Sequence, residues 1–273
     1  MSDVQTAPGR NPIARRRALR RELAVRGSVS VAELSQVLGA SAATVRRDLE
    51  ALSREGLLER SYGGAAVRST RPAEEALAVR AQRYVEEKAA VAQAAMALIE
   101  PGNTLFLNDG STVMALAQEL ATSEIELFVV TSAVNIAHVL VANPRITVCL
   151  LGGFVRSTSL ATGGQFAEAM IDQFNADLAL LSCDAFGAAE GMSFMHADDA
   201  AVARRMRARA KRAIALAIHP KFSASARITA VPAANIDGVV TDRMPPDVRQ
   251  SLAQHQIKIV EARRAPQRPN RHG

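Results

Sequence analysis

Residues 29–52 read VSVAELSQVLGASAATVRRDLEAL, and the apolar positions in this stretch have the spacing of two short helices. Positions 31, 34 and 38 fall on one helical face, and Gly39 then ends the first helix. Ser41 is suited to cap a second helix, in which positions 45, 49 and 52 form a buried stripe. Two short helices joined by a glycine-containing turn predict a helix-turn-helix.

The second of these helices presents a polar face once its apolar stripe is buried. The outward residues are Ser41, Ala43, Thr44, Arg46 and Arg47. In a helix-turn-helix docked in the major groove, the N-terminal residues of the second helix reach the base edges. An arginine there can pair with guanine or neutralise a phosphate, and a threonine can contact a base or a phosphate. Either arginine can take either role, so we expect this face to bind double-stranded DNA.

The segments on both sides of the helix pair also suit DNA binding. A helix expected at about 13–27 carries three arginines at 15–17, which could add phosphate contacts. After the pair, LLERSYGGAA at 57–66 predicts a small hairpin with a Gly-Gly turn. Arg60 and Tyr62 on this wing would track the DNA backbone or the minor groove. A helical protein–protein module with an arginine-rich surface explains the hairpin and the paired arginines less well.

Charge is unevenly distributed along the 273 residues. Residues 1–72 carry 13 arginines and 7 acidic residues, whereas residues 73–261 carry 16 basic and 20 acidic ones. The last 12 residues add four arginines. Basic ends on a mildly acidic body indicate that the ends meet a polyanion and that the body has another task.

Length and composition fit two domains in one chain. Apolar residues make up 48% of the sequence, which is enough for a packed core. There is no apolar leader, no run of about 18 apolar residues and no cysteine pair with metal-ligand spacing, so we expect a cytoplasmic protein without a membrane segment. The expected parts are a DNA-binding domain at 11–68, a linker at 69–76, a larger domain at 77–261 and a disordered basic tail at 262–273.

Beyond the linker, apolar runs of strand length alternate with helical segments. A long helix is expected at about 76–99, and further helices at 113–121, 134–141 and 200–212. The strand-like runs are TLFLND, ELFVVT, RITVCLL, LALLS, AIALAI and GVVT. Their hydrophobicity is continuous rather than alternating, which is typical of strands buried on both faces. The expected fold class is therefore α/β, with a mostly parallel sheet.

Polar residues and glycines follow three of these strands. They are Asp109, Gly110, Ser111 and Thr112, then Thr131 and Ser132, then Gly152 and Gly153. Hydroxyls and unpaired N–H groups at a helix start attract anions, and a carboxylate can accept hydrogen bonds from sugar hydroxyls. In open parallel sheets, the loops beyond the carboxyl ends of the strands form the ligand crevice. Each feature alone is more often a helix cap or a turn, but together they predict one pocket for a small anionic effector.

Two further residues are candidates for this pocket. Asp184, in LLSCDAFG, is either a pocket acid or an ordinary turn aspartate. Lys221 follows a strand and is either a salt-bridge partner for a ligand phosphate or a solvated loop lysine. His196 and His219 are isolated in the sequence, and no histidine–carboxylate cluster indicates a metal. We therefore expect neither a metal site nor a cofactor.

The block from Leu19 to Ala65 resembles the winged helix-turn-helix of the DeoR family of bacterial repressors. The letters that carry the resemblance are SVSVAEL, LGASAATVRRDL and GLLERSYGGA. Residues 75–260 resemble the sensor half of the same family through EKAAVAQAA around Lys88, NDGST, VVTS, LLGG, ADLALLS and VVTD. The resemblance implies a sensor domain similar in fold to ribose-5-phosphate isomerase and the CoA transferases. It also implies a phosphorylated sugar as effector, whose binding weakens operator binding.

The chain departs from the family pattern at three positions. Tyr62 stands where the family usually has histidine, and its hydroxyl and ring still suit DNA contact. Ile218 stands where an aspartate usually lies three residues before the pocket lysine. Ala203 stands where a basic residue is usual, with Arg204 beside it. The last two changes imply an altered effector, or weakened or lost effector binding.

Three functions are compatible with these observations. The leading one is a repressor of a carbohydrate-metabolism operon that responds to a small anion, binds its operator as a homodimer or higher homo-oligomer and is not an enzyme. The second is a sugar-phosphate isomerase or CoA-transferase-like enzyme with a DNA-binding appendage, for which Asp184 is the one attractive catalytic candidate. The third is a constitutive DNA-binding protein with a decayed sensor pocket, which Ile218 and Ala203 favour.

Overall fold

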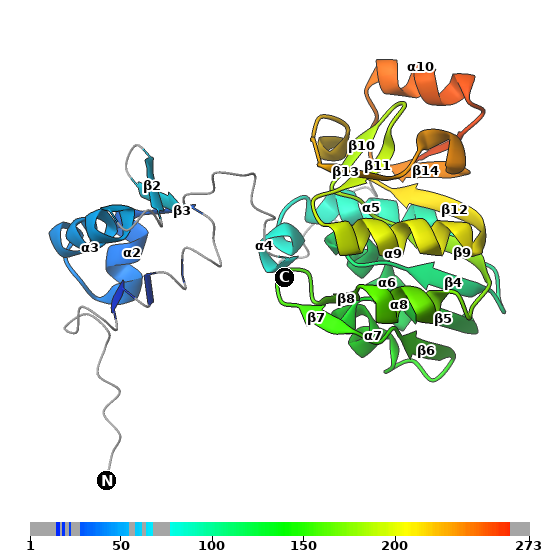
Figure 1. The fold of residues 1–273 in the computed structure, drawn as a ribbon, viewed down its shortest axis with the longest axis horizontal. Coiled ribbons are helices and arrows are strands. Elements are labelled where there is room, and N and C mark those ends of the chain that lie inside the picture. The colour runs from blue at the N-terminus through cyan, green and yellow to red at the C-terminus, as the bar shows by residue number, and fades with distance from the viewer. Residues whose placement is uncertain are drawn as a thin grey trace, which may run out of the picture. The chain divides into compact units, whose positions relative to one another are not determined.

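The computed structural model describes residues 15, 16, 18, 19, 22, 28–54, 58–61, 64–67 and 77–262. The chain divides into two compact units, Met1–Arg80 and Ala81–Gly273. Figure 1 shows a small helical unit with a short hairpin, and a larger unit in which helices cover a twisted sheet. The linker predicted at 69–76 and all but the first residue of the predicted tail lie outside the described residues.

The N-terminal unit is a helix-turn-helix with a three-stranded antiparallel sheet. Its elements are β1 (Ser28–Ser30), α2 (Val31–Leu38), α3 (Ala42–Arg54), β2 (Leu58–Ser61) and β3 (Gly64–Val67). The described residues between 15 and 22 are also helical. β3 lies between β1 and β2, so the predicted hairpin is confirmed. The strand β1 was not predicted, because the letters SVSV were interpreted as the start of a helix that begins only at Val31.

Local side-chain signals fix the ends of the two central helices. Ser30 and Glu33 form a capping box, in which the Glu33 N–H donates to Ser30 Oγ at 3.3 Å and the Ser30 N–H donates to Glu33 Oε2 at 3.0 Å. Gly39 has φ 61°, the left-handed conformation that ends a helix at low cost in glycine. Ser41 Oγ accepts from the Thr44 N–H at 3.3 Å, which confirms the predicted cap of α3.

A small apolar core joins the helices of the N-terminal unit. Its buried side chains, which include the predicted stripe of α3, are Leu19, Leu34, Leu38, Val45, Leu49 and Leu52. Beside this core, the Asp48 carboxylate lies 2.5 Å from Arg15 Nε and 3.2 Å from Arg16 Nε. The side chains of Arg15 and Asp48 are 8% and 5% exposed, so this buried ion pair fastens the first helix to α3.

Asp48→Asn is expected to destabilise the N-terminal unit by about 3 kcal/mol, because the buried Arg15 guanidinium loses its Asp48 counter-charge. Urea denaturation followed by circular dichroism measures this change in the free energy of unfolding. Glu124→Gln, at an exposed loop carboxylate, is the control and is expected to change stability by less than about 0.5 kcal/mol. Equal stabilities of the two variants would show that the ion pair does not hold α3 in place.

The larger unit is built on a seven-stranded sheet in which every neighbouring pair is parallel. The strand order is β15-β14-β12-β9-β4-β5-β6. The strands are β4 (Thr104–Leu107), β5 (Leu127–Thr131), β6 (Ile146–Leu150), β9 (Ala176–Leu181), β12 (Ala210–Leu216), β14 (Gly238–Thr241) and β15 (Lys258–Glu261). The first six of these confirm the strands predicted from the apolar runs, and the parallel α/β fold is confirmed with them.

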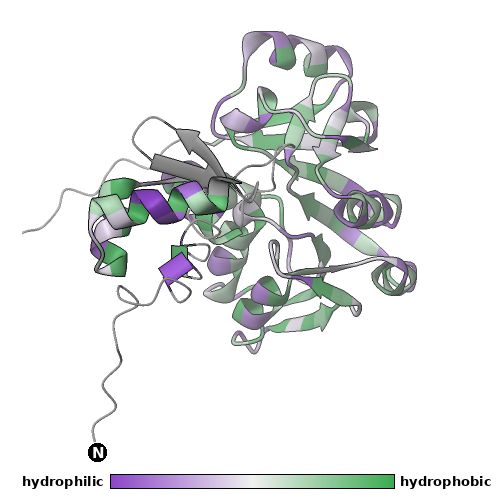
Figure 2. Cartoon of the chain, turned by 60° about the vertical axis from the view of Figure 1, so that its left-hand side comes forward, coloured by the Kyte–Doolittle hydropathy of each residue, from purple (hydrophilic) through white to green (hydrophobic). Residues whose placement is uncertain are grey.

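Helices cover both faces of this sheet (Figure 1). They are α5 (Val85–Met96), α6 (Ser111–Ala121), α7 (Val134–Leu140), α8 (Gln165–Ile171), α9 (Ala197–Ala208) and α10 (Pro246–Gln254). Successive side chains of a strand enter different cores: Leu105 and Leu107 share a cluster with α5 and α6, whereas Phe106 shares one with α8 and α9. Burial on both faces explains why the central strands are largely apolar, as the mainly green sheet in Figure 2 shows.

Short antiparallel elements lie outside the main sheet. β7 (Phe154–Arg156) pairs with β8 (Ala161–Gly163), and β10 (Ala185–Gly187), β11 (Gly191–Phe194) and β13 (Ile228–Val231) form a second group. The 3-10 turns η2 (His219–Phe222) and η3 (Ala233–Asn235) follow β12 and β13. None of these short elements was predicted.

The long helix expected at 76–99 is divided in two. α4 (Leu77–Gln82) ends before α5 begins, because Tyr84 takes the left-handed conformation, with φ 53°. The buried Lys88 ammonium group donates to the Arg83 carbonyl at 2.6 Å. In a continuous helix, the Arg83 carbonyl would accept from a backbone N–H. At the break, the Lys88 ammonium group takes the place of that donor.

Two predicted boundaries shift at strands of the sheet. The helix expected to reach residue 212 ends at Ala208, because β12 begins at Ala210, in register with Ala176 of β9. Ala262, the first residue of the predicted tail, is buried, and its N–H donates to the Thr241 carbonyl at 2.7 Å. Both shifts arise from strand pairing between distant segments.

Candidate functional site

Helix α3 carries the face predicted to contact DNA. The exposed residues of this face are Ser41, Ala43, Arg46 and Arg47. Thr44 is half-buried, and its Oγ1 lies 2.9 Å from Ser41 Oγ. The apolar stripe on the opposite side of α3 is buried in the core of the unit. The structure therefore brings together two guanidinium groups and two hydroxyls at the start of an exposed helix, an arrangement suited to base edges and phosphates in a major groove.

The arginines of the first helix have different surroundings. Arg15 is buried in its ion pair with Asp48, which corrects the expectation that it contacts phosphate. Arg16 shares the same carboxylate but keeps 41% of its side chain exposed, and its phosphate contact stays a prediction. Arg17 lies outside the described residues.

The wing carries the other two predicted DNA contacts. Arg60 lies in β2, where its backbone is the register partner of Ala65 in β3. Tyr62 lies between the two strands in the sequence and outside the described residues. The roles of both residues stay predictions.

The strand order of the larger unit brings the predicted effector residues to one edge of the sheet. β12, β9, β4, β5 and β6 are successive neighbours, and their parallel pairing puts the carboxyl ends on the same side. The ten predicted residues lie at or just beyond these ends: Asp109, Gly110, Ser111 and Thr112 at β4, Thr131 and Ser132 at β5, Gly152 and Gly153 at β6, Asp184 at β9, and Lys221 at β12.

A close approach between β4 and β9 shapes the first of these loops. Gly110 has φ 124°, and a Cβ atom there would lie 2.1 Å from Ser182 Oγ, so the position requires glycine. Ser182 Oγ donates to the Asp109 carbonyl at 2.9 Å, and Asn108 Nδ2 donates to the Ser182 carbonyl at 2.9 Å. Asn108 and Ser182 position this loop, and their contact was not predicted because the two residues are 74 positions apart in the sequence.

The start of α6 has no side-chain cap. Its N-cap is Gly110, which has no side chain to accept a hydrogen bond, and Ser111 and Thr112 lie in the first turn. Unpaired N–H groups and the helix dipole attract an anionic group to such a terminus. The carboxyl-bearing Asp109 immediately precedes this turn and is 8% exposed.

An unpaired hydroxyl lies at the neighbouring strand end. Ser132 is 1% exposed, and its Oγ has no hydrogen-bond partner within the described part of the chain. Leu107 of β4 and Thr131 of β5 are register partners, so Ser132 stands level with the loop before α6. A buried hydroxyl without a partner costs about 1–3 kcal/mol, which a bound ligand would offset. Thr131 differs, because its Oγ1 already accepts from the Ala133 N–H at 3.1 Å.

The third loop follows β6 and contains the predicted glycine pair. The Gly152 N–H points at Met170 Sδ, 3.0 Å away. Gly153 is exposed and has φ 138°, and a Cβ atom there would lie 2.9 Å from the Gly163 carbonyl. Gly153 therefore allows β8 to approach the end of β6 closely, and Gly152 leaves room for Met170 of α8.

Asp184 has the contacts of a turn aspartate. Its Oδ2 accepts from the Met195 N–H at 2.8 Å, and its own N–H donates to the Ser193 carbonyl at 3.0 Å. These bonds join the loop after β9 to the end of β11, which is a structural role. Burial raises the pKa of the adjacent Cys183 thiol to about 12, although the Lys221 charge acts in the opposite direction. Cys183 is therefore an apolar neighbour of this edge and not a nucleophile.

A histidine–carboxylate pair that the sequence analysis did not expect lies at the same edge. His219 Nδ1 lies 2.7 Å from Asp242 Oδ2, and the His219 N–H donates to Asp242 Oδ1 at 2.7 Å. These residues follow the neighbouring strands β12 and β14, so their 23-residue separation hid the contact. The Tyr84 ring meets the His219 ring edge-on, with 5.3 Å between centroids. The pair thus joins η2, which also carries Lys221, to the break before α5.

Two family domains match the two units of the chain. The DeoR-like helix-turn-helix domain matches residues 15–71, and the DeoR C terminal sensor domain matches residues 83–243. The chain belongs to the DeoR family. It is a DNA-binding transcriptional regulator, so the family and the fold class expected from the sequence are confirmed.

Curated relatives of this DeoR-family protein are named as regulators. The HTH-type transcriptional repressor CsqR of Escherichia coli K12 is 33% identical over 87% of this chain and 91% of its own length. The putative aga operon transcriptional repressor of Escherichia coli O157:H7 is 30% identical over 90% and 92%. The glycerol-3-phosphate regulon repressor of Escherichia coli K12 is 30% identical over 85% and 92%. These names agree with a regulator rather than an enzyme.

Solved structures resemble part of this DeoR-family chain. A D-ribose-5-phosphate isomerase in complex with phospho-erythronic acid aligns over 50% of this chain and 52% of that one, with a TM-score of 0.38 and 18% identity. The probable sor operon regulator from Shigella flexneri aligns over 51% and 77%, with a TM-score of 0.37 and 14% identity. Both similarities concern the fold.

Two kinds of feature are absent from the described residues. None of the helices there has the length and apolar character needed to cross a membrane. No group of three or more histidine, cysteine, aspartate or glutamate side chains gathers there to hold a metal ion. His219 and Asp242 are two groups only, which is fewer than the three that such a metal site needs.

The two sensor-domain departures from the DeoR pattern lie in the core, whereas Tyr62 lies outside the described residues. Ile218 is 2% exposed and packs with the cluster around α5 and α6. Ala203 is fully buried against the other face of the sheet. Arg204 is exposed and donates to the Thr229 carbonyl at 3.4 Å, so it does not replace a basic side chain at position 203. The N-terminus of α6 and Lys221 offer positive charge to an anion at this edge.

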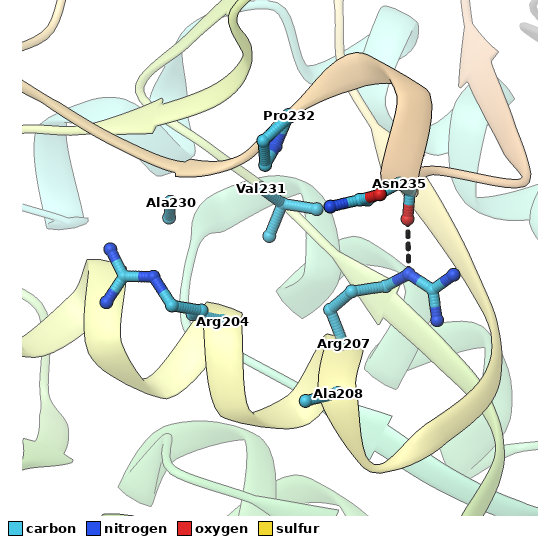
Figure 3. A pocket seen from close by; sticks show the side chains of 7 residues that line it. All are labelled: Arg204, Arg207, Ala208, Ala230, Val231, Pro232 and Asn235. Atoms are coloured by element: carbon cyan, nitrogen blue, oxygen red, sulfur yellow. Dashed lines mark hydrogen bonds between the residues drawn. The ribbon is translucent and has the colours of Figure 1, made fainter.

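A cavity of about 230 Å³ lies elsewhere, between α9 and β13 (Figure 3). Its lining includes Arg204, Arg207 and Asn235. Arg207 Nε donates to the Asn235 carbonyl, and its guanidinium lies 3.5 Å from the Asp237 carboxylate. The C-terminal turn of α9 leads directly into β12, so the cavity lies toward the amino ends of the strands. It is therefore separate from the predicted effector edge.

Proposed function

We propose that this protein is a repressor whose affinity for operator DNA falls when a small phosphorylated sugar, or a similar anion, binds at the carboxyl edge of the sensor sheet. The observation that carries the proposal is the juxtaposition of the uncapped α6 terminus with the buried, unpaired Ser132 hydroxyl. A helix N-terminus and an unpaired hydroxyl both suit the oxygen atoms of an anion.

Six of the predicted residues have a role in this proposal. Ser111 and Thr112 would bind the phosphate through the N–H groups and hydroxyls of the first turn of α6, and Lys221 would add a positive charge. Asp109 would accept hydrogen bonds from the hydroxyls of the sugar. Ser132 would donate or accept one further bond from the side of β5. Gly110 keeps this space clear of a side chain.

The relatives support a phosphorylated effector and a sugar-related target. One is named the glycerol-3-phosphate regulon repressor, and another the putative aga operon transcriptional repressor. On the DNA side, Arg46, Arg47 and Thr44 would read the operator, with Arg60 and Tyr62 on the wing. We further propose that the protein acts in the cytoplasm as a homodimer or higher homo-oligomer, because paired half-sites require two recognition helices.

Thermal unfolding of the full chain with a panel of sugars and sugar phosphates tests effector binding. At 100 times its dissociation constant, a ligand is expected to stabilise the protein by about 2.7 kcal/mol. Phosphorylated members should raise the melting temperature, and their unphosphorylated counterparts should not. If no member of a broad panel raises it, the decayed-sensor alternative is favoured instead.

The variant Ser132→Ala separates an effect on ligand binding from an effect on the stability of the unliganded protein. Removing an unpaired buried hydroxyl is expected to leave the unliganded protein as stable or more stable, by up to about 1 kcal/mol. The ligand-induced rise in melting temperature is expected to shrink or vanish. Ser225→Ala, at an exposed loop serine, is the matched control and should behave as the wild type. A full ligand-induced rise in Ser132→Ala would remove Ser132 from the proposed site.

A further inference from the structure

All the buried side-chain oxygens that lack a hydrogen-bond partner in the described part of the chain lie in two short segments. They are Ser132 Oγ and Asn135 Oδ1 around the start of α7, and Ser159 Oγ in the turn between β7 and β8. Ser132 is 1% exposed, Ser159 is fully buried and Asn135 is half-buried. A buried polar atom without a partner is uncommon in a folded protein, so three of them in one region point to a missing partner.

The two segments lie side by side. The Val134 N–H donates to the Leu160 carbonyl at 2.9 Å, and the Thr162 N–H donates to the Ser132 carbonyl at 2.8 Å. The sequence neighbours of the first of these pairs carry the other two unpaired oxygens. Figure 1 shows α7 and β8 in the same part of the larger unit. The three oxygens therefore belong to one region, just beyond the carboxyl end of β5.

The Asn135 amide also lies beside α6. Its Nδ2 donates to Met114 Sδ at 3.3 Å, and a thioether sulfur is only a weak acceptor. The Met114 N–H donates to the Gly110 carbonyl at 2.9 Å, so Met114 belongs to the turn of α6 that begins at Gly110. The amide can therefore offer hydrogen bonds to a ligand whose anionic group is bound at the start of α6.

The chemistry of this region suits hydroxyl groups better than a phosphate. Residues 131–137 and 157–164 contain no charged side chain. An amide and a serine hydroxyl both donate and accept hydrogen bonds, as a sugar hydroxyl does. The α6 terminus and Lys221 follow β4 and β12, whereas the three oxygens lie on the opposite side of β4, toward β5 and β6. A ligand at this edge thus meets positive charge at one end and neutral hydrogen-bonding groups at the other.

We infer that Asn135 and Ser159 bind hydroxyl groups of the effector and so select a polyhydroxylated phosphate ester over one with an apolar tail. The inference rests on the proposed function and assigns the end of the ligand that α6 does not bind. A site built to pair with hydroxyls disfavours an analogue that lacks them, because the polar groups of the site are then left buried and unpaired.

Binding of three phosphate esters to the full chain, measured by isothermal titration calorimetry, tests this inference. The esters are glycerol 3-phosphate, glucose 6-phosphate and propyl phosphate, which has the carbon chain of the first without its hydroxyls. Wild-type protein is expected to bind at least one of the hydroxylated esters about tenfold or more tightly than propyl phosphate. In Asn135→Ala and Ser159→Ala this preference is expected to shrink by about tenfold, with the affinity for propyl phosphate unchanged.

Asn235→Ala, at an exposed asparagine toward the opposite edge of the sheet, is the control and should keep the wild-type preference. Circular dichroism checks that each variant is folded. A wild type without preference among the esters, an unchanged preference in Asn135→Ala, or equal weakening of all three esters there would overturn the inference. Binding without preference would leave the proposed function standing, whereas no binding of any phosphate ester would overturn both.

Discussion

Arg46→Ala/Arg47→Ala is expected to abolish specific operator binding while leaving both units folded. A bidentate arginine–guanine pair contributes about 1–3 kcal/mol, so loss of two such contacts weakens binding by roughly 30-fold to 10⁴-fold. Both side chains are exposed on α3, opposite the buried stripe, so their truncation removes no core contact. Fluorescence anisotropy with a labelled promoter fragment measures the affinity at two or more salt concentrations.

The control for this variant removes the same charge from the sensor unit. Arg227→Ala/Arg243→Ala deletes two exposed arginines outside the DNA-binding unit and is expected to change operator affinity little. The single variants Arg46→Ala and Arg47→Ala then show which arginine contacts a base and which contacts a phosphate. Loss of a phosphate contact lowers the salt dependence by about one unit and weakens all sequences alike, whereas loss of a base contact relaxes specificity. Wild-type affinity in the double variant would exclude α3 as the recognition helix.

Gly110→Ala is expected to eliminate the effector response and to leave a repressor that stays on its operator. The added Cβ would lie 2.1 Å from Ser182 Oγ, and φ 124° is strained for any residue with a side chain. The loop must therefore move, and with it the first turn of α6 that is proposed to bind the anion. The ligand concentration needed to release DNA is expected to rise tenfold or more, as measured by fluorescence anisotropy.

Gly102→Ala is the matched control for Gly110→Ala. Gly102 also has a positive φ, 80°, but a Cβ atom there would meet nothing within 4 Å. This variant therefore carries backbone strain, about 1 kcal/mol, without crowding the effector loop. It is expected to lose some stability and to keep the wild-type response. An unchanged response in Gly110→Ala would contradict the placement of the effector at α6.

The DNA-binding unit was predictable because its signals are local. The capping residue Ser41, the helix end at Gly39 and the buried stripe of α3 all lie within 24 residues of one another and depend on spacing alone. What the sequence did not reveal there was a contact between distant positions. Arg15 pairs with Asp48, 33 residues away, and is structural for that reason.

In the sensor unit, the strands and the position of their loops at one edge of the sheet could be predicted from the sequence. Strands buried on both faces produce continuous apolar runs, and parallel order then brings their polar ends to one edge. Three features depended on tertiary contacts that spacing does not encode. These are the Asn108–Ser182 clamp, the His219–Asp242 pair and the left-handed Tyr84 that divides the predicted long helix.

The exposure of the apolar side chains that follow β6 was hidden for a related reason. Leu150, Phe154 and Phe166 look like core residues by composition, and only the fold leaves them exposed. Conversely, the polar residue expected of the family at 218 is replaced by an isoleucine that the core accommodates. Sequence could identify that substitution but not where its side chain would lie.

The most direct test of the central claim is the operator affinity of the full chain with and without the sugar phosphate that most raises its melting temperature. Coupling between the two sites predicts that a saturating ligand weakens operator binding by about 5-fold to 150-fold, with no such effect in Gly110→Ala. A ligand that stabilises the protein but leaves operator affinity unchanged would contradict the account, because binding at the sheet edge would then have no consequence for DNA.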